Sequence, residues 1–121
     1  MEFFIKKNNT FPLLLMKVIN DGKENENEMK NILEKSTIEF SMISENTGIP
    51  LIHKQRAFIT NSLNRENEWE GYYIFYQFTK KETAKSGRFR GEFTLNSNEG
   101  RLILPIRDDL FINIKDSIGI K

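Results

Sequence analysis

Apolar and polar residues alternate along most of the chain, and this period of two predicts a series of short β-strands. The clearest example is residues 37–44, where Ile38, Phe40 and Met42 alternate with polar residues and so share one face. Segments of this kind are half-buried strands, with one face in a core and the other toward solvent. The predicted strands are residues 3–7, 13–19, 37–44, 49–60, 72–79, 88–95, 101–104 and 110–115.

Glycine, asparagine and proline punctuate these strands at the places where a chain reverses. Asn46-Thr47-Gly48 predicts a turn after which residues 49–60 return antiparallel, and residues 96–100 predict a hairpin turn. Pro12 cannot donate to a strand ladder, so it separates the first two strands. Gly91 lies inside a strand, which indicates a bulge or a close approach by a neighbouring chain.

The strand predicted over residues 72–79 differs from the others because both of its faces are apolar. Ile74, Tyr76 and Phe78 share one face, and Tyr73 and Phe75 occupy the opposite one. A strand of this type is typical of the centre of a sheet whose outer face is also covered, by another element of the chain or by a partner.

Residues 24–35 carry the only pattern that predicts a helix. Met29, Ile32 and Leu33 have the spacing i, i+3, i+4 and form one narrow apolar stripe. Glutamates crowd the start of this segment and lysines lie toward its end, which suits the helix dipole. About three turns are marginal alone, so we expect this helix to lie across a sheet or to close one end of a sandwich.

Together these elements predict an all-β fold. The pattern favours an antiparallel, immunoglobulin-like β-sandwich of about seven to eight strands with one short inserted helix, residues 24–35. A β-barrel is the alternative. A length of 121 residues is that of one domain, so residues 1–121 are predicted to form a single sandwich.

Charge and composition exclude several classes of function. The chain has 18 basic and 17 acidic residues, a formal charge of +1, so no strong overall attraction to nucleic acid or to an anionic membrane is expected. It has no cysteine, hence no disulfide, thiolate metal site or cysteine nucleophile. No stretch approaches the roughly 20 apolar residues that span a bilayer.

No set of residues predicts an active site, and we expect a protein that is not an enzyme and needs no cofactor or metal. His53 is the only histidine and stands between Ile52 and Lys54, without a nucleophile and an acid beside it in sequence. Asp108 and Asp109 follow a proline and fit a solvated bend better than a cation site. Phosphate loops, dinucleotide fingerprints and HExxH motifs are absent from the sequence.

A basic segment between the strands predicted over residues 72–79 and 88–95 provides the main alternative. Basic side chains next to the aromatic Phe89 could bind single-stranded nucleic acid. Phe89 is in phase with Phe93 and is therefore expected in the core, and Glu82 and Glu92 dilute the charge, so a solvated loop and outer face is favoured. The basic residues of this segment are Lys80, Lys81, Lys85, Arg88 and Arg90.

Several phrases of the sequence, taken in order, resemble small structural proteins of tailed bacteriophages. They are FFIKKNNTFPLLLMKVINDG, TIEFSMISENTG, YYIFYQFTKKETAKSGRFRGEFTL and GRLILPIRDDLFINI. More loosely, the chain is similar to the immunoglobulin-like N-terminal domain of phage upper-baseplate proteins. The shared plan includes Thr83, Gly87, Phe89, Gly91 and Phe93, which are structural positions, so no functional residue is carried over. The segment 24–35 is an addition to that plan, and the chain ends at Lys121 where baseplate proteins continue.

The resemblance implies a virion protein, made in the cytoplasm of the bacterial host, that acts as an adaptor or decoration protein. Its partners would be capsid, neck, tail, baseplate or fibre proteins, and a homo-oligomer is compatible with a free edge strand. The alternatives are a small nucleic-acid-binding module and a host-directed phage inhibitor; an enzyme or ligand carrier is the least favoured. Aromatic side chains left outside the core are the expected contact residues: Phe3 and Phe4 at a free N-terminus, Tyr73, Phe75 and Phe111.

Overall fold

A computed structural model describes residues 1–18, 35–60, 72–98 and 100–118 of the chain, and the elements in these ranges are β-strands. The predicted helix, residues 24–35, lies outside the described residues except for Lys35, as does the loop predicted over residues 61–71. The strands are β1 (Glu2–Lys6), β2 (Leu14–Val18), β3 (Thr37–Ser44), β4 (Pro50–Arg56), β5 (Phe58–Thr60), β6 (Tyr72–Tyr76), β7 (Gly87–Ser97), β8 (Gly100–Leu104) and β9 (Leu110–Lys115).

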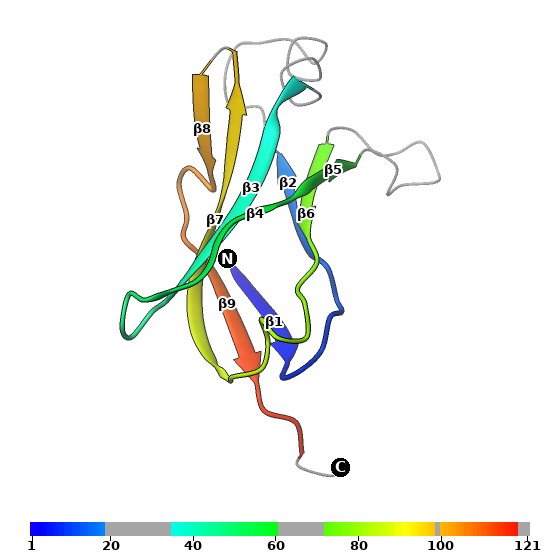
Figure 1. Cartoon of the computed structure of the whole chain (residues 1–121), viewed down its shortest axis with the longest axis vertical. Coiled ribbons are helices and arrows are strands. Elements are labelled where there is room, and N and C mark those ends of the chain that lie inside the picture. Colours follow the sequence, from blue (N-terminus) through cyan, green and yellow to red (C-terminus); the bar gives the residue numbers. More distant parts are fainter. Residues whose placement is uncertain (19–34, 61–71, 99, 119–121) are drawn as a thin grey trace.

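The strands form two sheets in a sandwich-like arrangement (Figure 1). The larger sheet has six strands in the order β1-β9-β7-β3-β4, with β8 also paired to β7. The smaller sheet has the order β2-β6-β5. Two packed sheets bury their facing sides and leave two outer faces in contact with solvent. The predicted all-β class is therefore confirmed.

Two features of the strand order differ from the prediction. The strand expected over residues 49–60 divides at the buried Ala57 into β4, in the larger sheet, and β5, in the smaller one, so the described residues hold nine strands. The expected sandwich was antiparallel throughout, yet β1 pairs with β9 in parallel. β1 and β2, on either side of Pro12, also lie in different sheets. A strand that changes sheets closes the side of the sandwich.

The core lies between the sheets and follows the predicted alternation. Phe40 on β3 is fully buried, and its ring centroid lies 4.7 Å from that of Tyr76, 5.0 Å from that of Phe93 and 5.9 Å from that of Phe78. Aromatic pairs at these separations contribute a stabilising free energy in addition to the contribution from their buried area. The same core contains, among others, Ile38, Met42, Ile52, Ile74, Leu95, Leu110, Ile112 and Ile114.

β7 is the longest strand, and it organises the larger sheet. One side of β7 pairs with β3, and the other pairs first with β9 and then with β8. The predicted hairpin between residues 88–95 and 101–104 is confirmed by the β7–β8 pairing. Gly91 lies at the point of β7 where the pairing partner changes from β9 to β8. A Cβ atom added at Gly91 would lie 2.8 Å from both Phe40 Cζ and Ile112 Cδ1. The close approach predicted at Gly91 is thus made by side chains of this chain.

Candidate functional site

The outer face of the three-stranded sheet carries a row of apolar side chains. Phe75 of β6, one of the predicted contact residues, lies between Leu15 of β2 and Phe58 of β5 in the strand register. Leu15 is 42 % exposed and Phe58 49 % exposed, and the rings of Phe58 and Phe75 lie 5.7 Å apart. Tyr73, the other residue predicted on β6, lies half-buried on the same face. We call Leu15, Phe58, Tyr73 and Phe75 the aromatic face.

Positive charge borders the aromatic face in the described part of the chain. Lys17 is exposed and opposes Tyr73 in the register of β2 and β6. The Arg56 guanidinium lies 5.8 Å from the centroid of the Phe58 ring, a cation–π arrangement. An apolar centre with a charged border is the usual layout of a protein-binding surface. The sequence pattern missed Leu15 and Phe58 because only the register places them beside Phe75.

The other predicted contact residues do not join the aromatic face. Phe3 points inward, and its ring lies 6.0 Å from that of Phe78. Phe4 is 57 % exposed on β1, and Phe111 is half-buried on β9, both on the outer side of the larger sheet. The expectation of a free N-terminal segment is wrong, because β1 is paired along its length with β9 and Met1 O accepts a hydrogen bond from Phe111 N.

Arg88, predicted as a nucleic-acid contact, is held by neighbours on the larger sheet. Its Nη1 and Nη2 atoms lie 3.1 and 2.9 Å from the two carboxylate oxygens of Glu2, and its guanidinium lies 4.0 Å from the centroid of Phe111. The Asn113 amide also donates to Glu2 Oε1 at 2.8 Å. The hydrogen bond from Asn113 and then that from Arg88 lower the pKa of Glu2. The bidentate ion pair with Glu2 neutralises the charge of Arg88, so Arg88 is less available to bind a phosphate.

The rest of the predicted basic segment is divided between two places. Arg90 lies on the outer face of β7 with its Nε 4.0 Å from Glu45 Oε2. Lys80, Lys81 and Lys85 are exposed in the connection between β6 and β7. Phe89, the aromatic residue of that segment, is 8 % exposed and belongs to the core, as its phase predicted. The segment therefore offers three lysines and no accessible ring of its own.

Residues 79–83 form a turn with a fixed shape, built around the Glu82 carboxylate. Tyr76 OH donates to both Glu82 oxygens, at 2.9 and 2.7 Å, and Thr79 N donates to Glu82 Oε1 at 2.8 Å. Glu82 N in turn donates to Thr79 Oγ1 at 3.2 Å, so the two residues satisfy each other as in a capping box. Thr83 is fully buried, and its Oγ1 donates to Asn9 O at 2.8 Å. The turn is thus joined to the β1–β2 connection.

Replacing Tyr76 with phenylalanine is expected to destabilise the protein at neutral pH by about 1–3 kcal/mol, the net contribution of a hydrogen bond to a charged group. Burial, and then the Glu82 carboxylate, raise the pKa of Tyr76. The folded protein therefore keeps the Tyr76 proton at a pH where the unfolded chain loses it, so the stability that Tyr76 contributes falls as pH rises above about 10. Urea denaturation of both proteins at pH 7 and at about pH 10.5 measures this. An equal advantage of the natural protein at both pH values would contradict it.

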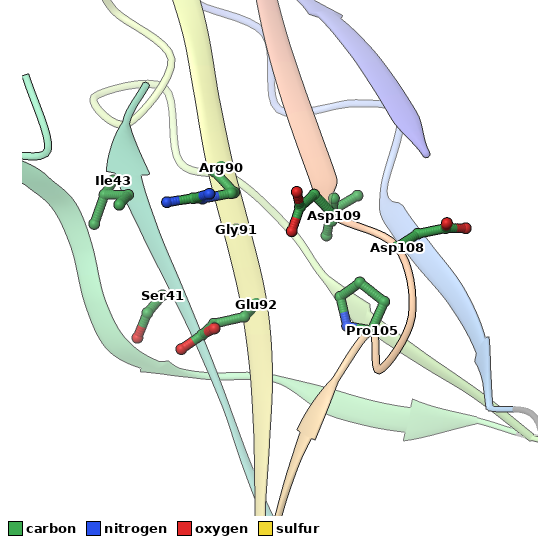
Figure 2. Close-up of a pocket in the computed structure, with 9 residues that line it drawn as sticks. Ser41, Ile43, Arg90, Gly91, Glu92, Pro105, Asp108 and Asp109 are labelled. Atoms are coloured by element: carbon green, nitrogen blue, oxygen red, sulfur yellow. The ribbon is translucent and has the colours of Figure 1, made fainter. Parts of the chain in front are cut away.

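An open pocket of about 240 Å³ lies on the larger sheet, in the gap between the end of β8 and the start of β9 (Figure 2). Arg90 and Glu92 of β7 border it on one side, and Pro105, Asp108 and Asp109 on the other. Asp108 and Asp109 lie in an exposed bend, as predicted. In the described ranges, no three histidine or acidic side chains are close enough to hold a metal ion. His53 is exposed on β4 and does not line this pocket.

Within the described residues, no helix has the length and apolar character needed to cross a membrane. Of the surfaces described above, the aromatic face carries exposed apolar side chains, and the β6–β7 connection carries exposed lysines. The chain matches no protein-family model, no curated protein and no solved structure.

Proposed function

We propose that the chain is a structural protein of a tailed-phage particle, that it works by protein–protein contact rather than catalysis, and that its sandwich is of the immunoglobulin-like kind. The observation that carries this proposal is the aromatic face, where the exposed Leu15 and Phe58 flank Phe75 across three strands. Exposed apolar patches of this kind typically mark interaction sites. The sequence resemblance to phage structural proteins supports the choice of a virion partner.

The occupant of the aromatic face is another virion protein with an apolar centre and an acidic border. Lys17 and Arg56 border the face, so carboxylates on the partner would complement it. A second copy of the chain, docked face to face, would instead oppose its own cations to these two residues. The partner is therefore a different chain of the capsid, neck, tail, baseplate or fibre.

Gradient-purified particles of the phage that encodes the chain provide the test. Quantitative mass spectrometry is expected to find the protein at a fixed ratio to the major capsid protein. A ratio near one indicates capsid decoration, and a much smaller ratio indicates the neck, tail, baseplate or fibre. Absence from clean particles would overturn the proposal and favour a host-directed inhibitor.

The variant Phe58→Ala tests the aromatic face within that proposal. Truncating an aromatic residue at the centre of an interface costs about 1–2 kcal/mol or more, so we expect at least about fivefold weaker binding and fewer copies per particle. Ile49→Ala is the control, because Ile49 is also a large exposed apolar residue, at 64 %, but lies in the β3–β4 connection. Equal incorporation of both variants would exclude the aromatic face as the docking surface.

A further inference from the structure

Six exposed lysines gather at one end of the sandwich, and we call this group the basic end. The ends of β1 and β9 and the β6–β7 connection meet there, in the lower part of Figure 1. Only half of these lysines belong to the basic segment predicted from sequence; the others come from strands far away along the chain. The basic end consists of Lys6, Lys7, Lys80, Lys81, Lys85 and Lys115.

Backbone pairing brings these three segments together. Lys6 opposes Lys115 in the parallel register of β1 and β9, and Lys7 N donates to Lys115 O at 2.8 Å. Asn8 N donates to Thr83 O at 2.9 Å, which places the β1–β2 connection beside the turn that holds Lys80 and Lys81. Because these contacts are backbone contacts, the lysines are held near one another whatever their side-chain rotamers.

Little negative charge compensates the basic end. In the described part of the chain, none of the six lysines forms an ion pair with a carboxylate. The Glu82 carboxylate lies in the same turn and keeps its negative charge, but its oxygens are bound by Tyr76 OH and Thr79 N and not by a lysine. Lys6 Nζ reaches Asp116 only through that residue's backbone oxygen, at 3.2 Å. Six lysines against the carboxylates of Glu82 and Asp116 leave this end net positive, although the formal charge of the whole chain is only +1.

Two exposed aromatic rings accompany these lysines. Phe4 is 57 % exposed on the same face of β1 as Lys6, and Phe11 is 64 % exposed in the connection that follows Lys7. An open depression of about 460 Å³ at the same end is lined among others by Lys6, Lys115 and Asp116. Its volume is within the range of sites that accept small ligands. Exposed rings and lysines at one end of the sandwich supply both stacking and charge to a ligand.

We propose that the basic end binds single-stranded nucleic acid. The lysines would contact phosphates, and unpaired bases would stack on Phe11 and Phe4, the combination that single-strand-binding surfaces use. A duplex keeps its bases stacked inside and cannot use the rings, and an acidic protein segment would use the lysines without needing two flat aromatic faces. The site differs from the one predicted by sequence, since Phe89 is buried, Arg88 and Arg90 have carboxylate neighbours, and Lys6, Lys7 and Lys115 are added.

Fluorescence anisotropy of the full chain with a labelled single-stranded DNA of about 20 nucleotides tests this site. We expect binding at about 50 mM salt that weakens steeply toward about 200 mM, because each phosphate contact adds about 0.7 to the slope of log affinity against log salt. Lys80→Ala, Lys81→Ala and Lys85→Ala together are expected to lower the affinity at least about tenfold and the slope by about 2.

Matched controls separate specific contacts from general charge. Replacing Lys17, Lys35 and Arg101 with alanine removes the same charge from exposed positions outside the basic end and is expected to leave the affinity within about twofold and the slope unchanged. Phe11→Ala is expected to lower the affinity at least about fivefold at an unchanged slope, since stacking involves no ion release. Phe58→Ala on the aromatic face should leave nucleic-acid binding intact.

Three results would overturn the proposal. One is the absence of binding at low salt, and another is equal loss of affinity in the two lysine triple variants. The third is a poly-glutamate peptide or a duplex of the same length that competes better than the single strand, which would assign the basic end to an acidic protein or to duplex DNA.

Discussion

Replacing Phe40 with alanine is expected to lower the free energy of unfolding by about 3–5 kcal/mol, the usual cost of removing a buried phenylalanine. Phe40 is fully buried, and its ring contacts those of Tyr76, Phe78 and Phe93. Its removal would leave a cavity between the two sheets, because these neighbours are held on both sheets, Tyr76 at the end of β6, Phe78 just after it and Phe93 on β7, and cannot all move inward. Urea denaturation followed by circular dichroism measures the change as a lower midpoint at an unchanged slope.

Phe58→Ala provides the control for Phe40→Ala, because it removes the same atoms from an outer face. Phe58 is 49 % exposed, so we expect a loss below about 1 kcal/mol. The two variants also distinguish an effect on folding from an effect on docking. We expect Phe58→Ala to weaken binding to a virion partner and Phe40→Ala to lower the free energy of unfolding. Similar losses in the two variants would mean that Phe40 is not at the centre of the core.

The alternation of apolar residues was sufficient to predict most strands and their buried faces. Each strand depends on a local pattern of period two, and burial of one face enforces that pattern. Ile38, Phe40 and Met42, which share one face of residues 37–44, are buried as expected. Phe89 was assigned to the core by its phase with Phe93, and the structure confirms this. Where the pattern is regular, sequence alone determines which side chains face the core.

The division of residues 49–60 between two sheets was not predictable in the same way. Residues 50–56 contain one buried residue, Ile52, and the chain then crosses to the other sheet at Ala57. Such a crossing depends on the partners of each half, β3 for one and β6 for the other, which are distant in sequence. The parallel pairing of β1 with β9 joins the two ends of the chain and has no local sequence signal either.

The residues of the candidate surfaces were also predictable only where they are close together in sequence. Tyr73 and Phe75 were predicted because their strand is apolar on both faces, whereas Leu15 and Phe58 became visible only through the register. Lysines at 80, 81 and 85 are a local cluster, but Lys6 and Lys115 join them through strand pairing. Conversely, the predicted Arg88 is neutralised by Glu2, which lies 86 residues earlier in the chain. The sequence therefore predicts clusters of neighbouring residues, whereas the tertiary structure determines which charged side chains remain free to bind a ligand.

Gly91→Ala is expected to destabilise the protein by about 1–3 kcal/mol, although alanine is small and suits the backbone there. The added Cβ would lie 2.8 Å from Phe40 Cζ, 2.9 Å from Phe40 Cε1 and 2.8 Å from Ile112 Cδ1. Ile112 Cδ1 is the end of a flexible side chain and can rotate away. The Phe40 ring is rigid and enclosed by other rings, so the clash with Phe40 decides the cost.

A double-mutant cycle with Phe40→Leu tests this assignment. Leucine lacks the Cζ and Cε1 atoms, so Gly91→Ala should cost at least about 1 kcal/mol less in the Phe40→Leu background than in the natural protein. Urea denaturation of the four proteins gives the coupling free energy directly. If Gly91→Ala costs the same in both backgrounds, the glycine is required for a reason other than the ring. A coupling of the expected size would instead show that Gly91 and Phe40 form one packing unit, in which the missing side chain on β7 makes room for the central ring of the core.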